Sequence, residues 1–147
     1  MQELLTVFVT WLSLTFALPA NYETPKVELV SASEMLARRY SYQAASLHGP
    51  VAADTHHDLH AVYDDRNQTI YLLEGWSAES PADVSVLLHE VVHHLQNVGG
   101  LEYDCPEARE RTAYEAQARW LELVGKSLAE EFELDAMTIL IRTNCLH

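Results

Sequence analysis

The feature that most constrains the chain is the run Val84–Val98, which contains His89-Glu90-Val91-Val92-His93 and ends before Gly99-Gly100. Apolar residues recur in this run at spacings of three and four, which predicts a single amphipathic helix. On that helix the two histidines lie one turn apart, on the face opposite the apolar stripe. Two imidazoles so placed can bind one metal ion, with Glu90 beside them to act on a metal-bound water. We therefore predict a metal site here rather than two solvent-facing histidines.

A catalytic zinc ion usually has three protein ligands, so one ligand must come from another part of the chain. No H-x-x-G-x-x-H follows the first two histidines, which excludes the three-histidine class. The next predicted helix begins after Asp104, extends to about Glu131 and offers four carboxylates: Glu107, Glu110, Glu115 and Glu122. Glu107 is better explained as part of a helix cap. Helical phase places Glu110 on the apolar face and Glu115 on the charged face, so we predict Glu110 as the third ligand. The alternative for Glu110 is an ion pair with a nearby arginine.

The first twenty residues differ in composition from the rest of the chain. Leu4–Leu18 is apolar apart from Thr and Ser, and Ala17 or Ala20 offers a small residue for cleavage. This pattern is typical of a secretory signal peptide, although Met1-Gln2-Glu3 carries no basic residue. An uncleaved anchor and a core helix are the alternatives, and the run is short for a membrane span of about 20 residues. We expect cleavage, a single mature domain at residues 21–147, and a secreted or periplasmic location.

The chain has two cysteines, Cys105 and Cys145. In an oxidising compartment they are expected to form a disulfide, whereas two reduced, buried thiols are the alternative. Closing a loop of about 40 residues would stabilise the fold by roughly 3–4 kcal/mol in the chain-entropy model.

The charge of the chain limits its partners. The net charge is −13, from 22 acidic and 9 basic residues, and the basic residues form no cluster. Such a chain is poorly suited to bind nucleic acid or an anionic membrane. We expect no nucleic-acid partner and no membrane binding after signal cleavage.

The remaining patterns predict an α+β fold, a mainly helical domain with a small β-hairpin beside the helix of the H-E-x-x-H motif. Two short strands joined by a polar turn are predicted at Leu59–Tyr63 and Thr69–Leu73. Further helices are predicted from Ser31 to about Leu47 and from Leu134 to Arg142. Four histidines, His48, His56, His57 and His60, surround a predicted loop and could suggest a second metal site. His56, His57 and His60 have no recognisable ligand spacing, so we interpret them as loop and surface residues.

The two helix motifs together resemble a known class of enzymes. His89-Glu90-x-x-His93 followed by Glu110-x-x-Ala113-Tyr114-x-x-Gln117 resembles the gluzincin type of zinc metallopeptidase, and the extension His93-His94-Leu95-Gln96 resembles small exported bacterial members. The resemblance covers about Val84 to Leu121. It implies a minimal zincin-like domain that binds Zn²⁺. Many relatives have Asp or Asn where this chain has Tyr114, so we expect Tyr114 or Gln117 to hold a ligand histidine.

The resemblance also implies an activity. It predicts hydrolysis of a peptide or protein substrate by a metal-activated water, with Glu90 as general base. Extended substrate would pair with the hairpin, at Thr69–Leu73, by strand addition. The alternatives are a non-catalytic zinc-binding or protein-interaction domain on the same scaffold, and a zinc hydrolase that acts on a non-peptide bond.

Overall fold

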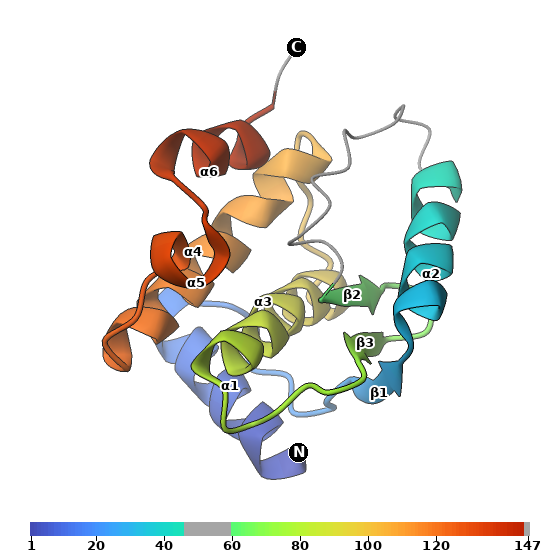
Figure 1. Ribbon diagram of the computed structural model, residues 1–147, viewed down its shortest axis with the longest axis horizontal. Coiled ribbons are helices and arrows are strands. Elements are labelled where there is room, and N and C mark those ends of the chain that lie inside the picture. The colour runs from blue at the N-terminus through green and yellow to red at the C-terminus, as the bar shows by residue number, and fades with distance from the viewer. Residues whose placement is uncertain (46–59, 146–147) are drawn as a thin grey trace.

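The computed structural model describes residues 1–45 and 60–145 and has the predicted α+β architecture (Figure 1). The described strands are β1 (Lys26–Val30), β2 (Ala61–Asp64) and β3 (Thr69–Leu73). The described helices are α1 (Gln2–Phe16), α2 (Ala32–Ala45), α3 (Pro81–Val98), α4 (Pro106–Leu123), α5 (Leu128–Phe132) and α6 (Ala136–Thr143). Helix α3 passes through the middle of the molecule, with the sheet on one side and α1 and α4 packed against it (Figure 1).

The three described strands form one sheet in the order β1-β3-β2. Strands β2 and β3 pair antiparallel, which confirms the predicted hairpin. Strand β1 pairs parallel with β3, and the chain between them includes α2 and β2. This parallel partner was not predicted, because β1 is short and its mostly exposed side chains show no clear alternation. Since both edges of β3 are occupied, the expected addition of substrate to Thr69–Leu73 is wrong.

The sheet separates two apolar clusters, because alternate side chains of a strand point to opposite faces. Tyr71 packs with Val30 of β1 and Met35 of α2 on one face. Ile70 and Leu72 point the other way, into the main core around α3. Helix α2 and helix α3 therefore cover opposite faces of the sheet, which fixes the position of α3 (Figure 1).

Helix α3 begins as its sequence predicts. The Ser80 hydroxyl accepts a hydrogen bond from the backbone N–H of Asp83, and Pro81 occupies the first turn. Every residue from Val84 to Gln96 is buried, including the polar ones. A helix buried on all sides needs partners for its polar side chains, and α4 runs alongside to supply them.

The segment that we interpreted as a signal peptide is a packed helix of the core, as in the core-helix alternative. Four side chains of α1 are almost fully buried: Leu5, Phe8, Val9 and Leu12. The ring of Phe8 meets Trp120 of α4 edge to face, with centroids 5.0 Å apart. A Cβ built on Gly99 would lie 2.5 Å from Pro19, so the residues that follow α1 pack closely on the end of α3.

The described structure packs α1 with the rest of the domain, and cleavage that leaves a mature domain at residues 21–147 stays a prediction. Export itself stays a prediction. No helix in the described part of the chain is long and apolar enough to cross a membrane.

The second long helix is shorter than predicted. Helix α4 ends at Leu123, whereas the sequence pattern extended it to about Glu131. Gly125 adopts a left-handed φ of +73° and the backbone N–H of Lys126 bonds to the carbonyl of Leu121, which closes the helix end. A separate short helix, α5, begins after Ser127, whose hydroxyl caps it.

The predicted disulfide between Cys105 and Cys145 is confirmed. Cys105 is the N-cap of α4, where Asp104 was expected, and Cys145 follows α6. Arg111 reinforces this link, because its guanidinium donates to the carbonyl of Thr143 and the side chain of Asn144. The C-terminal helix is thus fastened to the first turns of α4.

The packing of α1 predicts a large effect for one substitution and a small one for its neighbour. Phe8→Ala should lower the free energy of unfolding by about 3–5 kcal/mol, because it leaves a cavity beside Trp120. Val7→Ala, on the exposed side of the same helix, should change it by less than about 0.5 kcal/mol. Urea unfolding of both variants measures the difference. Equal, small effects would show that α1 does not pack in the core.

Candidate metal centre

Three side chains from two helices meet at one point. Glu110 Oε2 lies 2.9 Å from His89 Nε2 and 3.2 Å from His93 Nε2. One ligand atom from each of the three residues lies within 4.8 Å of the others. Both histidines are buried in α3, whereas the Glu110 side chain on α4 is 35% exposed, which leaves the group open on that side. Glu115, the alternative set aside on helical phase, is exposed.

The tautomer of His89 follows from its hydrogen bonds. Its Nδ1 lies 2.9 Å from Gln117 Oε1, and the Gln117 amide nitrogen donates to Ser85 Oγ at 3.1 Å. The Ser85 hydroxyl donates its proton to the carbonyl of Ala82, so its oxygen can only accept the hydrogen bond from the Gln117 amide. The amide oxygen of Gln117 must therefore face the ring, and His89 must carry a proton on Nδ1.

His93 is held in the same way by a second amide. Its Nδ1 lies 2.9 Å from Gln96 Oε1, and Gln96 Nε2 donates to the carbonyl of Arg109 at 3.0 Å. The same Gln96 oxygen accepts from Arg109 Nε at 3.3 Å. This arrangement permits only one orientation of the amide, so His93 also donates from Nδ1.

With both Nδ1 atoms protonated, the neutral rings direct bare Nε2 lone pairs at the Glu110 carboxylate. That contact is repulsive unless a cation lies between the groups, either a proton or a metal ion. Burial opposes a charge on His93, but Glu110 outweighs it and raises the pKa of His93 to about 9. Burial raises the pKa of the Glu110 carboxyl, but the two histidines lower it by more. The pKa of Glu110 is therefore well below its usual value. The donor set, two imidazole nitrogens and one carboxylate oxygen, could hold a metal ion.

Glu90 lies next to this group and is buried. Burial raises the pKa of the Glu90 carboxyl, although the neighbouring histidines act in the opposite direction. Among the residues that the structure describes, none donates a hydrogen bond to this carboxylate. A buried carboxyl group is costly to ionise, and its place beside the three converging side chains makes Glu90 a candidate functional residue.

Tyr114 and His94 have packing roles. The Tyr114 ring meets the His89 ring edge to face at 4.8 Å, and its hydroxyl accepts a bond from Arg142. Of the two residues expected to hold a ligand histidine, Gln117 makes the hydrogen bond. Buried His94, whose pKa is lowered by burial, donates from Nε2 to the carbonyl of Glu23 at 3.0 Å. It thereby ties the segment after α1 to α3.

Sequence reasoning missed two parts of this centre, the support of Gln117 by Ser85 and the contacts of Arg109. The i to i+3 spacing of His93 and Gln96 was a signal for their hydrogen bond. Of the loop histidines, His48, His56 and His57 lie outside the described residues. The ring of His60 faces Phe132 at 6.4 Å.

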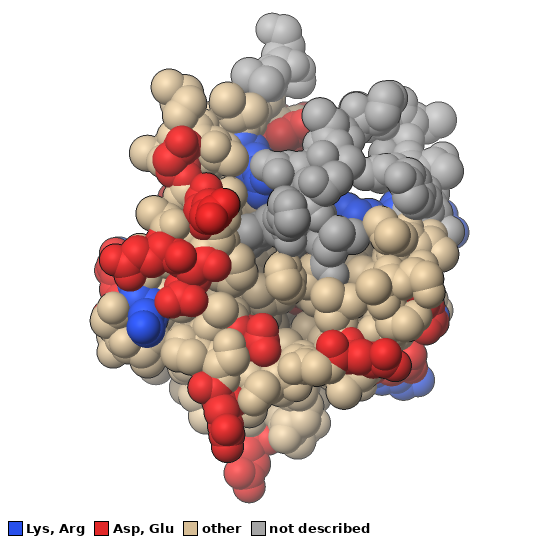
Figure 2. All heavy atoms as spheres, viewed as in Figure 1, with Lys and Arg blue, Asp and Glu red and all other residues tan. Residues whose placement is uncertain are grey.

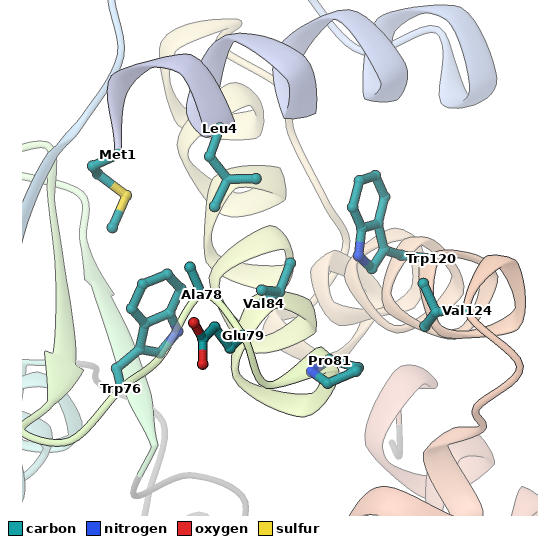
Figure 3. A pocket seen from close by; sticks show the side chains of 9 residues that line it. All are labelled: Met1, Leu4, Trp76, Ala78, Glu79, Pro81, Val84, Trp120 and Val124. Carbon is teal, nitrogen blue, oxygen red and sulfur yellow. The ribbon is translucent and has the colours of Figure 1, made fainter.

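A pocket of about 420 Å³ lies elsewhere, at the start of α3. Trp76 and Trp120 stand at opposite sides of it, with Leu4 of α1 above and Glu79 between them (Figure 3). None of the three converging residues lines this pocket, so it is separate from the metal centre.

Acidic side chains are spread over the face of the molecule seen in Figure 2. They are densest over α5, which carries Glu130 and Glu131, and the few basic side chains on this face are separate. The described part of this face therefore presents no basic patch.

Comparison with known proteins gives a family but no activity. The family model described as "Domain of unknown function (DUF6647)" matches residues 1–147. No curated protein and no solved structure matches the chain. Inference about function therefore depends on the geometry of the centre.

The geometry predicts which acid is needed to hold a metal ion. Wild-type protein should bind about one zinc ion per chain, Glu110→Ala should lose most of this binding, and Glu115→Ala should keep it. Both variants truncate a glutamate of α4. Glu110 lies on the face that meets the two histidines, whereas Glu115 lies on the exposed face. Metal analysis after dialysis against dilute zinc measures the content. Equal zinc content in both variants would contradict the assignment of Glu110.

The raised pKa of His93 predicts that metal binding depends on pH. A metal ion must displace the proton that the metal-free site holds below about pH 9. The affinity for zinc should therefore fall about tenfold for each pH unit below 9, with about one proton released per ion bound at pH 8. Titrations in buffers of different ionisation enthalpy measure the released proton. An affinity that stays constant from pH 9 to pH 7 would contradict this coupling.

Proposed function

We propose that this chain, which belongs to the DUF6647 family over its whole length, is a zinc-dependent metallopeptidase. The observation that carries the proposal is the convergence of His89, His93 and Glu110, with both imidazole Nδ1 atoms committed to buried amides. This commitment leaves each Nε2 free to bind a metal ion. The resemblance of the two helix motifs to gluzincins adds the reaction type.

Within this proposal, His89, His93 and Glu110 hold the zinc ion and Glu90 moves the protons. When bound, zinc would polarise the substrate carbonyl and lower the pKa of a water molecule. Glu90 takes a proton from the attacking water and passes it to the leaving nitrogen of the peptide bond. Burial raises the pKa of its carboxyl above the ordinary value, and a raised pKa suits an acid that must accept and return a proton.

Two observations favour an enzyme over a non-catalytic zinc domain. Structural zinc sites usually have four protein ligands, whereas the group found among the described residues has three. That number leaves a position for water or substrate. In addition, a structural site has no need of Glu90, whose buried carboxylate reduces stability. The non-catalytic domain remains the second candidate.

The paired edges of β3 restrict how an extended substrate can bind. Only an outer strand of the described sheet, β1 or β2, has an edge for strand addition. Strand β2 packs against α3, the helix that carries Glu90, and β1 lies on the far side of β3. We therefore place a bound peptide beside β2.

The proposal predicts that Glu90 is needed for turnover and not for metal binding. Glu90→Gln should keep about one zinc ion per chain and lower peptide hydrolysis by at least about 10²–10⁴-fold, because the proton acceptor is lost. Cleavage of a quenched-fluorescence peptide library measures hydrolysis, and Glu115→Gln, on the exposed face of α4, is the control. Full activity of Glu90→Gln would refute this mechanism. A zinc-loaded wild type that cleaves no peptide would favour the non-catalytic domain.

A further inference from the structure

We propose that Gln96 is the positioning residue that joins two of the metal ligands, His93 and Glu110, through a single carboxamide. The inference rests on the metal site of the proposed function and does not require peptidase activity. His93 and Glu110 lie on different helices, so their relative position depends on contacts between α3 and α4.

The carboxamide of Gln96 accepts a hydrogen bond from a residue of α3 and donates one to a residue of α4. Its side chain is fully buried, and its oxygen accepts the His93 Nδ1 proton at 2.9 Å. Its nitrogen donates at 3.0 Å to the carbonyl of Arg109, which belongs to the peptide unit that leads into Glu110. A movement of the amide would displace one ligand ring and the backbone of another ligand together.

Arg109 closes this arrangement and attaches it to the sheet. Its guanidinium donates to the Gln96 oxygen and to the backbone carbonyl of His93, at 3.3 Å and 3.2 Å. The same group forms a two-bond ion pair with Asp65 in the turn between β2 and β3, at 2.8 Å and 3.0 Å. The amide of Gln96 is therefore held from both sides and cannot turn over without breaking several hydrogen bonds.

Gln117 offers a matched comparison, because it is also a buried glutamine that accepts the Nδ1 proton of a ligand histidine. Its nitrogen bonds to the Ser85 hydroxyl on α3, and not to the backbone next to Glu110. Gln117 lies on α4 and its amide contacts one ligand, His89, whereas the amide of Gln96 contacts His93 and the peptide unit that leads into Glu110.

The test measures zinc affinity for Gln96→Met and Gln117→Met, each in wild-type protein and in a Glu110→Ala background. Losing a group that orients a ligand typically weakens metal binding by about 10–100-fold. Gln96→Met should show such a loss in wild type and a clearly smaller one once Glu110 is absent, because part of its effect passes through Glu110. Gln117→Met should show the same fold-change in both backgrounds.

Cobalt(II) absorption adds a readout that does not depend on activity or on affinity alone. The spectrum of Gln96→Met should shift toward that of Glu110→Ala, whereas the spectrum of Gln117→Met should not. Thermal unfolding of every variant checks the fold. Gln96→Ala is the second variant if Gln96→Met fails to fold, because the smaller side chain leaves room for water to satisfy His93 and Arg109 separately without joining them.

The outcomes separate this inference from the proposed function. The role of Gln96 would be overturned if Gln96→Met changed zinc affinity by the same factor in both backgrounds. It would also be overturned if the variant kept the wild-type zinc affinity and cobalt(II) spectrum. Either result would leave the peptidase proposal intact. Zinc binding that shows the expected coupling between Gln96 and Glu110, without peptide cleavage, would support the positioning role of Gln96. The same result would count against the proposed peptidase activity. A folded wild-type protein that binds neither zinc nor cobalt would overturn both.

Discussion

The structure depends on the burial of α3 from every side. Its apolar face packs against α1 and the sheet, which is ordinary for a central helix. Its other face carries His89, His93 and Gln96, which are also buried and must find partners. Helix α4 supplies them with Glu110, Gln117 and the backbone of Arg109. The same contacts that satisfy the buried polar side chains of α3 therefore also assemble the candidate metal centre.

The amides around the histidines have an electrostatic consequence. Many zinc sites hold their imidazoles with carboxylates, which add negative charge near the metal and strengthen the ligand nitrogens. Gln96 and Gln117 fix the same tautomer without adding charge. Glu110 is then the one anionic ligand of the group, with Glu90 as the neighbouring acid. A zinc ion in such surroundings would keep more of its positive charge for polarising a bound carbonyl.

Prediction from sequence succeeded where one periodicity dominated. The 3.6-residue pattern located α3, and helical phase on α4 separated Glu110 from Glu115 correctly in space. It left alternatives open where the same pattern has two physical meanings, because an apolar run of fifteen residues is compatible with a signal peptide and with a core helix. The contacts of Arg109 could not be predicted, since Asp65 and Gln96 meet it only through tertiary packing.

The packing of α1 affects the order in which the chain can fold. This helix is synthesised before α3 and α4, yet Phe8 and Trp11 find their partner in Trp120 of α4. During synthesis its apolar side stays exposed until α3 and α4 have been made, because contacts distant in sequence close late. The nascent chain thus presents an unburied hydrophobic helix to whatever meets it at the ribosome, and the completed domain covers that helix with its own core.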